Sequence, residues 1–179
     1  MQTLIIIRGH SGSGKSTFAQ QKIAEFKARY LESVIFHIEN DHFLIENGEY
    51  HWTIERFQQA KQRAQQKLVE AFAYCAEYPL QHVCIVVSNV GGNANEIERL
   101  KAQAKQTGLE TVVYRLQNFF PNTHHVEPQL VYEMYLSLNA NPVQDEILLA
   151  PIQPMTEAIR NDIETLQALK RKNRYTKKM

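Results

Sequence analysis

The chain has 179 residues, a formal net charge of +1, 44% hydrophobic residues and 22% charged residues, which is an ordinary composition for one globular domain. A domain of this length buries roughly 70% of its unfolded surface, so folding requires no disulfide or structural metal. The two cysteines, Cys75 and Cys84, cannot by themselves make a disulfide framework or a four-ligand zinc site, and we expect buried thiols in a reducing, cytoplasmic setting. The near-neutral charge gives no overall case for a nucleic-acid partner, and no apolar run is long enough for a membrane span or a signal peptide.

Strand and helix periodicities alternate along the chain. A short apolar run predicts a buried strand at 4–7, and apolar residues at three-to-four spacing predict a helix across 19–30. Further strands at 34–38, 83–87 and 111–116 alternate with helices across 54–75, 97–104 and 131–138. A short fifth strand at 146–150 precedes a final helix, which has Thr156 as its N-cap candidate and is expected to turn Ile159, Ile163, Leu166 and Leu169 inward. This alternation predicts an α/β fold, a parallel sheet with helices on both faces, and a ligand site beyond the carboxyl ends of the strands.

The segment between the first predicted strand and helix is a complete phosphate-loop motif, G-x-x-x-x-G-K-[ST]. Its residues are Gly9, His10, Ser11, Gly12, Ser13, Gly14, Lys15, Ser16 and Thr17. Glycines let the backbone approach an anion closely, and the N–H groups that open the following helix favour negative charge. We therefore expect this loop to bind ATP, with Lys15 reaching the β- and γ-phosphates and the Ser16 hydroxyl coordinating Mg²⁺.

An acidic residue stands where a phosphoryl acceptor would bind. Asp41 follows the second predicted strand, at the sheet edge where ligands bind in such folds. A carboxylate at that edge can take the proton of an acceptor hydroxyl during phosphoryl transfer. The alternative is an aspartate that initiates a turn by hydrogen bonding to local backbone.

The phosphate loop, the triplet Asp41-His42-Phe43 and the segment 47–52 together resemble the AAA-type P-loop kinases of the polynucleotide 5′-hydroxyl kinase group and, more loosely, the zeta-toxin sugar-nucleotide kinases. The resemblance runs in order from Leu4 to about Ile152. It implies a kinase-type P-loop fold with strand order 2-3-1-4-5, an ATP·Mg²⁺ site, and Asp41 as the catalytic base. The candidate acceptor-binding residues are His42, Tyr50, Trp52 and Asn89.

Two departures from the family pattern bear on catalysis. Ser88 precedes Asn89 where the family has an acidic residue, which removes an expected metal or acceptor contact. The lid expected around 117–127 carries no arginine, because none lies between Arg115 and Arg160. Arginines of this kind stabilise charge in related enzymes, so a nucleotide-binding regulatory protein with little turnover stays open as an alternative.

Three further features each have two interpretations. The lid histidines His124 and His125 supply positive charge if protonated, or are solvated loop residues. The aromatic residues Phe43, Tyr50 and Trp52 stack on a base of the acceptor, or pack a loop. A basic tail contacts nucleic-acid phosphates, or is solvated. The tail residues are Lys170, Arg171, Lys172, Arg174, Lys177 and Lys178.

The sequence thus predicts a P-loop kinase-like core over 1–152, with a short lid around 117–127, and a C-terminal helix and basic tail of the same domain over 153–179. The predicted activity is transfer of the γ-phosphoryl group of ATP, with Mg²⁺, to a hydroxyl acceptor. The resemblance favours a polynucleotide 5′-hydroxyl, and a nucleoside or sugar is the alternative. No membrane partner is expected, and the sequence assigns no oligomeric state.

Overall fold

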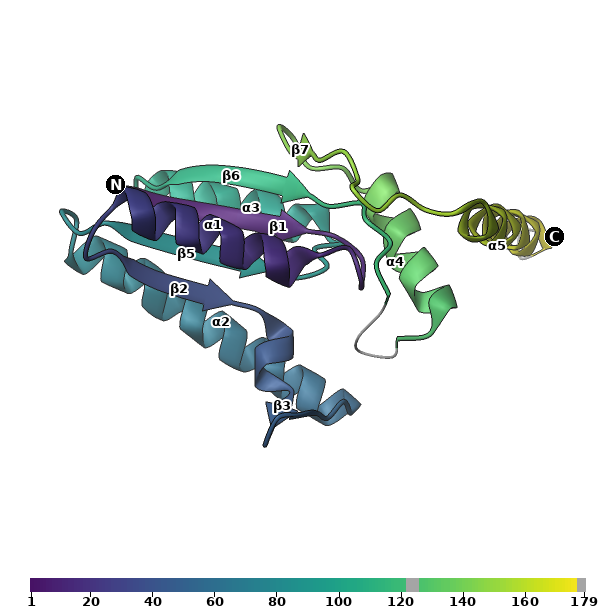
Figure 1. The fold of residues 1–179 in the computed structure, drawn as a ribbon, viewed down its shortest axis with the longest axis horizontal. Coiled ribbons are helices and arrows are strands. Elements are labelled where there is room, and N and C mark those ends of the chain that lie inside the picture. The colour runs from purple at the N-terminus through teal and green to yellow at the C-terminus, as the bar shows by residue number, and fades with distance from the viewer. Residues whose placement is uncertain (122–125, 177–179) are drawn as a thin grey trace.

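A parallel sheet forms the middle layer of the computed structural model, which describes residues 1–121 and 126–176, the last three by their backbone alone (Figure 1). Its five strands lie in the order β2-β5-β1-β6-β7. They are β2 (Val34–Ile38), β5 (Val83–Ser88), β1 (Gln2–Arg8), β6 (Glu110–Arg115) and β7 (Ile147–Leu148). A separate antiparallel hairpin follows β2 and consists of β3 (Ile45–Glu46) and β4 (Glu49–Tyr50). Numbered in chain order without this hairpin, the sheet strands have the order 2-3-1-4-5, as expected.

Helices cover both faces of the sheet (Figure 1). On one face lies α1 (Lys15–Arg29), and on the other lie α2 (Ile54–Glu77) and α3 (Ala94–Gln106). A short 3₁₀ helix, η1 (Asn40–Phe43), follows β2. The last two helices, α4 (Pro128–Ala140) and α5 (Glu157–Thr176), lie beyond the carboxyl ends of the strands (Figure 1). The α/β fold with helices on both faces of a parallel sheet is therefore confirmed.

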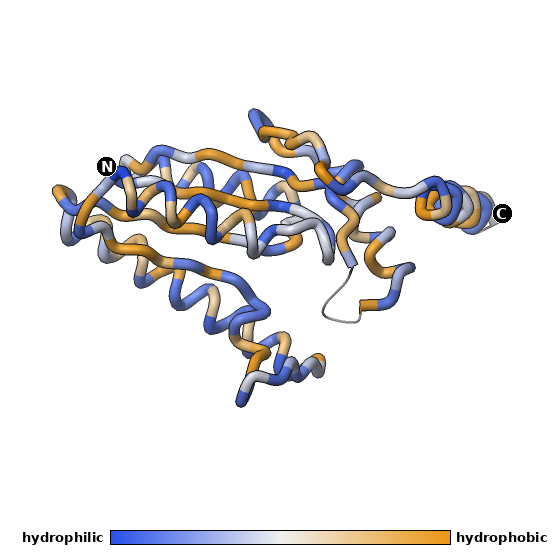
Figure 2. Tube along the Cα trace, viewed as in Figure 1, coloured by the Kyte–Doolittle hydropathy of each residue, from blue (hydrophilic) through white to orange (hydrophobic). Residues whose placement is uncertain are grey.

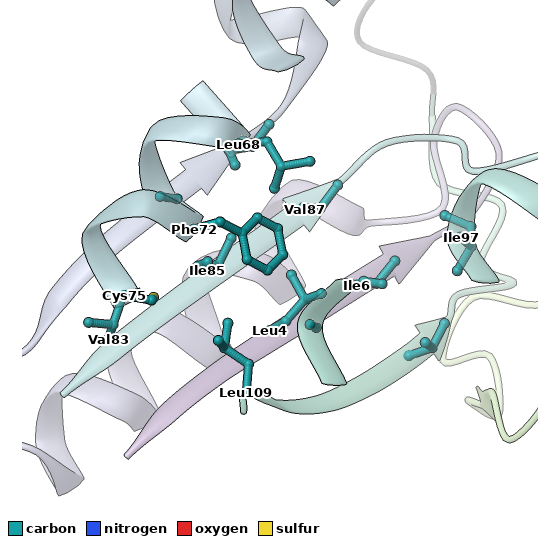
Figure 3. Packing of buried hydrophobic residues seen from close by; sticks show 14 of the residues in the cluster. Leu4, Ile6, Leu68, Phe72, Cys75, Val83, Ile85, Val87, Ile97 and Leu109 are labelled. Atoms are coloured by element: carbon teal, nitrogen blue, oxygen red, sulfur yellow. The ribbon is translucent and has the colours of Figure 1, made fainter. Parts of the chain in front are cut away.

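The central strand β1 is apolar on both faces because each face meets a helix layer. Leu4 and Ile6 belong to the cluster beneath α2 and α3, where Phe72 lies over the sheet (Figure 3). Ile5 and Ile7 point to the other face and pack with α1. Each fully buried aliphatic side chain contributes about 1.5–3 kcal/mol relative to exposure. Figure 2 shows the same pattern as hydrophobic stretches along the inner strands.

Buried charges fix the far end of β1. The Arg8 guanidinium is fully buried and donates hydrogen bonds to the carbonyls of Gly91 (2.9 Å) and Asn141 (2.8 Å). It also pairs with Glu146, whose other carboxylate oxygen lies 3.6 Å from Arg115. This network holds β1, β6 and the loops before α3 and β7 together at the carboxyl edge of the sheet.

The C-terminal helix differs in part from the expectation. Thr156 is its N-cap, since its hydroxyl accepts a hydrogen bond from the Ile159 N–H at 3.2 Å. Ile163 is buried, but Leu169 is 53% exposed, so its predicted inward orientation is wrong. The physical reason is that α5 lies apart from the sheet and its helix layers (Figure 1), so helical periodicity alone does not ensure that every residue of its apolar face is covered.

The two cysteine thiols are buried and unpaired, as predicted. Burial raises the pKa of Cys84 to about 12, so its thiol stays protonated and acts as a small apolar group. Within the described residues, no helix combines the length and apolarity that crossing a membrane would require.

Candidate active site

The phosphate loop joins β1 to α1 through a backbone path that requires glycine. Gly12 and Gly14 have φ angles of 79° and 91°, in the left-handed region that glycine adopts without strain. At Gly9, a β-carbon would lie 2.3 Å from the Ser13 hydroxyl oxygen, which leaves no room for a side chain. The glycines thus shape the turn, and α1 begins at Lys15 directly after it.

His10 contributes to this loop through its backbone. Its imidazole is fully buried and packs against Phe119, with ring centroids 4.3 Å apart, and edge-on against Tyr135 at 5.7 Å. Burial, with a further effect of the nearby Lys15 ammonium, lowers the pKa of His10 to about 4. The ring is therefore neutral near pH 7 and packs behind the loop, away from the cleft described below.

Lys15 is positioned over the loop. Its Nζ donates a hydrogen bond to the His10 carbonyl at 3.0 Å. Burial lowers the pKa of Lys15, while the carboxylates of Glu39 and Asp41 act in the opposite direction. The lysine thus lies within the field of two acids that come from the loop after β2.

Glu39 connects the phosphate loop to the neighbouring strands. This residue is 4% exposed and follows β2 directly. Its Oε1 accepts a hydrogen bond from the Ser16 hydroxyl at 2.7 Å, and its Oε2 accepts one from the Ser88 hydroxyl at 3.0 Å. A carboxylate therefore lies beside Ser16 even though the expected acidic position at the end of β5 is a serine. Sequence reasoning missed this role, although Glu39 directly follows the second predicted strand at the ligand edge.

Asp41 lies in η1, close to the same cleft. The Tyr50 hydroxyl, from β4, donates a hydrogen bond to Asp41 Oδ1 at 3.3 Å. Burial and the Asp41 charge raise the pKa of Tyr50 to about 12, so the phenol remains a donor. Asn89 holds the first residue of η1, because its Oδ1 accepts a hydrogen bond from the Asn40 N–H at 2.9 Å.

The other predicted acceptor residues separate into two groups. Trp52 is 56% exposed and lines the cleft together with Tyr50. Phe43 packs against the hydrophobic core under α2, as its alternative interpretation expected. His42 lies beside the carboxylate of Glu39, with its Nε2 3.5 Å from Oε2, and is not among the described residues that line the cleft.

A single cleft of about 1420 Å³ brings the phosphate loop, Glu39 and Asp41 together. Pockets for one small ligand usually measure about 300–1,000 Å³, so this cleft exceeds the usual size of a site for a single small ligand. Two basic residues on the helices line it as well, Lys61 on α2 and Arg99 on α3. The sequence did not predict either residue at the site, because both lie within helices and not in a loop at the ligand edge of the sheet.

The chain segment after β6 crosses behind the phosphate loop. The Phe120 N–H donates a hydrogen bond to the Gly12 carbonyl at 2.9 Å, and the buried Asn118 side chain donates one to the Ser13 carbonyl at 3.0 Å. Part of the expected lid therefore packs on the loop. His124 and His125 lie outside the described residues.

Comparison with solved structures agrees with this architecture. Kti12 of Chaetomium thermophilum, solved in complex with ADP-AlF3, is 12% identical, covers 92% of this chain and 97% of its own, and superposes with a TM-score of 0.51. The APS kinase CysC of Mycobacterium tuberculosis, in its Cys556Ala mutant, is 13% identical over 94% of this chain and 96% of its own. It superposes with a TM-score of 0.46. The strand order and the phosphate loop together show that the chain adopts the α/β P-loop NTPase fold.

A relative of high sequence identity is the uncharacterized protein PM0531 of Pasteurella multocida (strain Pm70). It is 72% identical over 179 residues, which is 100% of both chains. The chain belongs to the same family as this protein. No protein-family model matches the chain.

Proposed function

We propose that the protein is an ATP-dependent kinase that transfers the γ-phosphoryl group to a hydroxyl acceptor. The observation that carries the proposal is that one cleft is lined both by the phosphate loop and by Asp41, Tyr50 and Trp52. Phosphoryl transfer needs a donor phosphate and an acceptor hydroxyl held in line, and little other chemistry from the protein.

The loop residues fit the phosphates of ATP. Two left-handed glycines and the N-terminus of α1 turn backbone N–H groups toward an anion. The Lys15 ammonium at this loop would move from the His10 carbonyl to a phosphate oxygen. Residues 9–17, His10 by its backbone, therefore form the proposed nucleotide site.

The residues beside Ser16 fit Mg²⁺. The Ser16 hydroxyl oxygen and Glu39 Oε1 lie 2.7 Å apart, and adjacent oxygen ligands of an octahedral Mg²⁺ ion lie about 3 Å apart. The donors are oxygens, which this cation prefers. When bound, the ion would supply a Lewis acid that neutralises charge on the phosphate oxygens. Ser16 is the proposed ligand, and Glu39 adds a carboxylate that the serine at position 88 does not provide.

Asp41 is the proposed catalytic base. The hydrogen bond from Tyr50 orients its carboxylate, which would accept the proton of the attacking hydroxyl. Arg99 and Lys61, which line the cleft, are the proposed source of the positive charge that the lid lacks.

The proposed acceptor is the 5′-hydroxyl of a polynucleotide, with a nucleoside or sugar as the alternative. Tyr50 and the exposed Trp52 support an acceptor that carries a base, because aromatic side chains stack on bases for about 1–3 kcal/mol each. The basic tail from Lys170 onward would reach a longer polynucleotide by contacting its phosphates. His42 and Asn89 would act on the acceptor indirectly, by holding the segment around Asp41.

Core and tail are proposed to be parts of the same domain. Residues 1–152 would form the kinase core with its short lid around 117–127, and residues 153–179 the C-terminal helix and tail. The buried, unpaired thiols support a cytoplasmic location, where thiols stay reduced.

The test compares wild type with Asp41→Asn, using γ-labelled ATP, 5′-hydroxyl oligonucleotides, and a panel of nucleosides and sugars. Loss of a general base costs roughly 10²–10⁴-fold in rate, so we expect labelled product to fall at least about 100-fold while ATP affinity stays within about threefold. Asp162→Asn, which changes an exposed aspartate on α5, is the matched control and keeps full rate.

The acceptor that becomes labelled decides between the two acceptor classes. Label on metabolites alone removes the polynucleotide. Tight ATP binding by wild type with no labelled acceptor would contradict the kinase and favour a nucleotide-binding regulatory protein.

A further inference from the structure

Two histidines and one glutamate converge at the carboxyl end of β2, next to the phosphate loop. His37 belongs to β2, Glu39 follows it, and His42 lies in the first turn beyond. Three potential metal-ligand atoms, one from each residue, lie within 4.8 Å of one another. The cluster ranges from the buried carboxylate of Glu39 to the His42 side chain, which is 43% exposed, so an ion can reach it from solvent.

The spacing matches the coordination of a tetrahedral metal ion. His37 Nε2 and His42 Nε2 each lie 3.5 Å from the same oxygen, Glu39 Oε2. Ligands about 2.1 Å from a tetrahedral ion lie about 3.4 Å from one another. The two imidazole rings are perpendicular, with centroids 4.7 Å apart, so both rings lie beside this carboxylate oxygen and close to each other.

The surroundings hold these side chains in place. Lys67 donates a hydrogen bond from Nζ to the His37 carbonyl at 2.6 Å, and the Gln20 side-chain amide lies 3.5 Å from His37 Nδ1. Ser88 Oγ lies 2.8 Å from His37 Nε2 and 3.0 Å from Glu39 Oε2, so the third neighbour of these two side chains is an uncharged hydroxyl.

The donor set selects a different cation from the one proposed at Ser16. Mg²⁺ prefers oxygen ligands, whereas two imidazoles and a carboxylate suit Zn²⁺ or another first-row transition metal. The two carboxylate oxygens of Glu39 face different groups: Oε1 faces Ser16 and Oε2 faces both histidines.

We propose that His37, Glu39 and His42 form a binding site for one first-row transition metal ion, separate from the nucleotide site and joined to it through Glu39. Its fourth ligand position belongs to water. This proposal does not depend on kinase activity. Because Glu39 is shared, occupancy of the histidine site and the affinity for nucleotide are coupled, and each changes the other by the same factor.

The test is titration of the untagged protein with Co²⁺ alone, followed by its visible absorption, and competition by Zn²⁺. We expect one Co²⁺ per chain with tetrahedral absorption, displaced by Zn²⁺. His42→Ala is the main variant because its side chain is largely exposed, so the fold is kept; it should weaken Co²⁺ binding at least about tenfold. His37→Ala should do the same, with circular dichroism to verify that it folds.

Two controls separate this site from others. His51→Ala removes an exposed histidine that pairs with Glu49 in the nearby hairpin and should leave Co²⁺ binding unchanged. Ser16→Ala removes a hydrogen-bond donor to Glu39 Oε1 and none of the three proposed ligands, so the tetrahedral Co²⁺ absorption should persist in this variant. No tetrahedral Co²⁺ signal, equal binding in wild type and His42→Ala, or binding that is lost only with Ser16→Ala would overturn the proposal. Failure of phosphoryl transfer in the Asp41 test leaves every one of these outcomes unaffected.

Discussion

At the scale of single residues, Glu39 has the most consequential environment in the cleft. It is a buried acid whose hydrogen bonds come from the serines of two neighbouring structural elements. A buried carboxylate is costly unless cations or donors compensate it, so a cation bound beside this phosphate loop would stabilise it further. Its neighbour Lys15 contributes part of that compensation.

Glu39→Gln should weaken nucleotide binding only when Mg²⁺ is present. The amide keeps the size and can accept the hydrogen bond from Ser16, but it lacks the charge that supports a divalent cation. We expect affinity for ATP with Mg²⁺ to fall at least about tenfold, or ~1.4 kcal/mol, while affinity in a chelator stays equal or rises, because one anion beside the phosphates is gone. Fluorescent-nucleotide titrations in both conditions measure this difference. Glu70→Gln, an exposed change on α2, is the control; equal loss in both conditions for Glu39→Gln would contradict the cation role.

His10 gives the protein an acid-sensitive stability. Its pKa is lowered from 6.5 to about 4, so the native state binds fewer protons than the unfolded chain between these values. The contribution is fully present above pH 6.5 and is lost as the pH falls toward 4, by up to about 1.4 kcal/mol per pH unit. His10→Phe keeps an aromatic ring in the packing and removes the titration.

Urea unfolding at several pH values between about pH 7 and pH 4 measures this effect. The free energy of unfolding should decline less steeply with acid in His10→Phe than in wild type. His37, whose pKa is also lowered to about 4, mainly by burial, remains in both proteins, so the difference in slope reports His10 alone. Parallel slopes would show that His10 does not titrate in this range.

At the scale of secondary-structure elements, Glu146 connects strands that are far apart in the sequence. It lies just before β7 and pairs with Arg8 at the end of β1 and with Arg115 at the end of β6. All three charges are almost fully buried. Two parallel strands that end in facing arginines would repel each other without this acid.

Glu146→Gln should therefore destabilise the protein strongly. Removing one member of a buried ion pair leaves uncompensated charge and costs about 3–5 kcal/mol. Glu133→Gln is the matched control on α4, since its pair with Lys170 is exposed to solvent and is worth less than about 1 kcal/mol. Denaturant unfolding of the two variants gives both values. A loss for Glu146→Gln no larger than that of the control would mean that the buried network contributes little to stability.

At the scale of the whole molecule, local sequence patterns predicted the elements whose structure depends mainly on neighbouring residues. The strand, the phosphate loop and helix α1 follow directly from a continuous apolar run, glycines and helical periodicity, and the sheet order followed from the resemblance. The inward orientation of Leu169 was wrong because periodicity assigns a residue to a face of a helix without determining whether another layer covers that face.

Several contacts of the candidate site depend on tertiary structure, which no local sequence pattern predicts. Glu39 meets Ser16, 23 positions earlier, only because β2, β5 and β1 are neighbours whose carboxyl ends share one edge. His10 occupies a variable position of the motif, so its pattern could not indicate that the side chain packs behind the loop. Arg99 reaches the cleft from a helix, and no loop pattern marks it.

Asn118 links the C-terminal part of the molecule to the phosphate loop. Its amide donates to the Ser13 carbonyl at 3.0 Å, and its oxygen accepts from the N–H groups of Ile152 at 2.7 Å and Gln153 at 3.1 Å. The segment that leads into α5 thus shares one buried side chain with the nucleotide site. If residues 153–179 are part of the same domain, damage to this link should affect stability and nucleotide binding together.

Asn118→Ala removes three hydrogen bonds and leaves buried polar partners, so we expect a loss of about 2–4 kcal/mol in the free energy of unfolding. ATP affinity should fall several-fold at a temperature where the variant is still fully folded. The reason is that the loop loses the hydrogen bond from Asn118 that holds the Ser13 carbonyl in place. Denaturant unfolding and fluorescent-nucleotide titration measure the two effects. Asn95→Ala, at an exposed site on α3, should change the free energy of unfolding by less than about 0.5 kcal/mol and leave ATP affinity unchanged. A destabilised Asn118→Ala protein that binds ATP like wild type would show that the C-terminal segment supports the fold without acting on the phosphate loop.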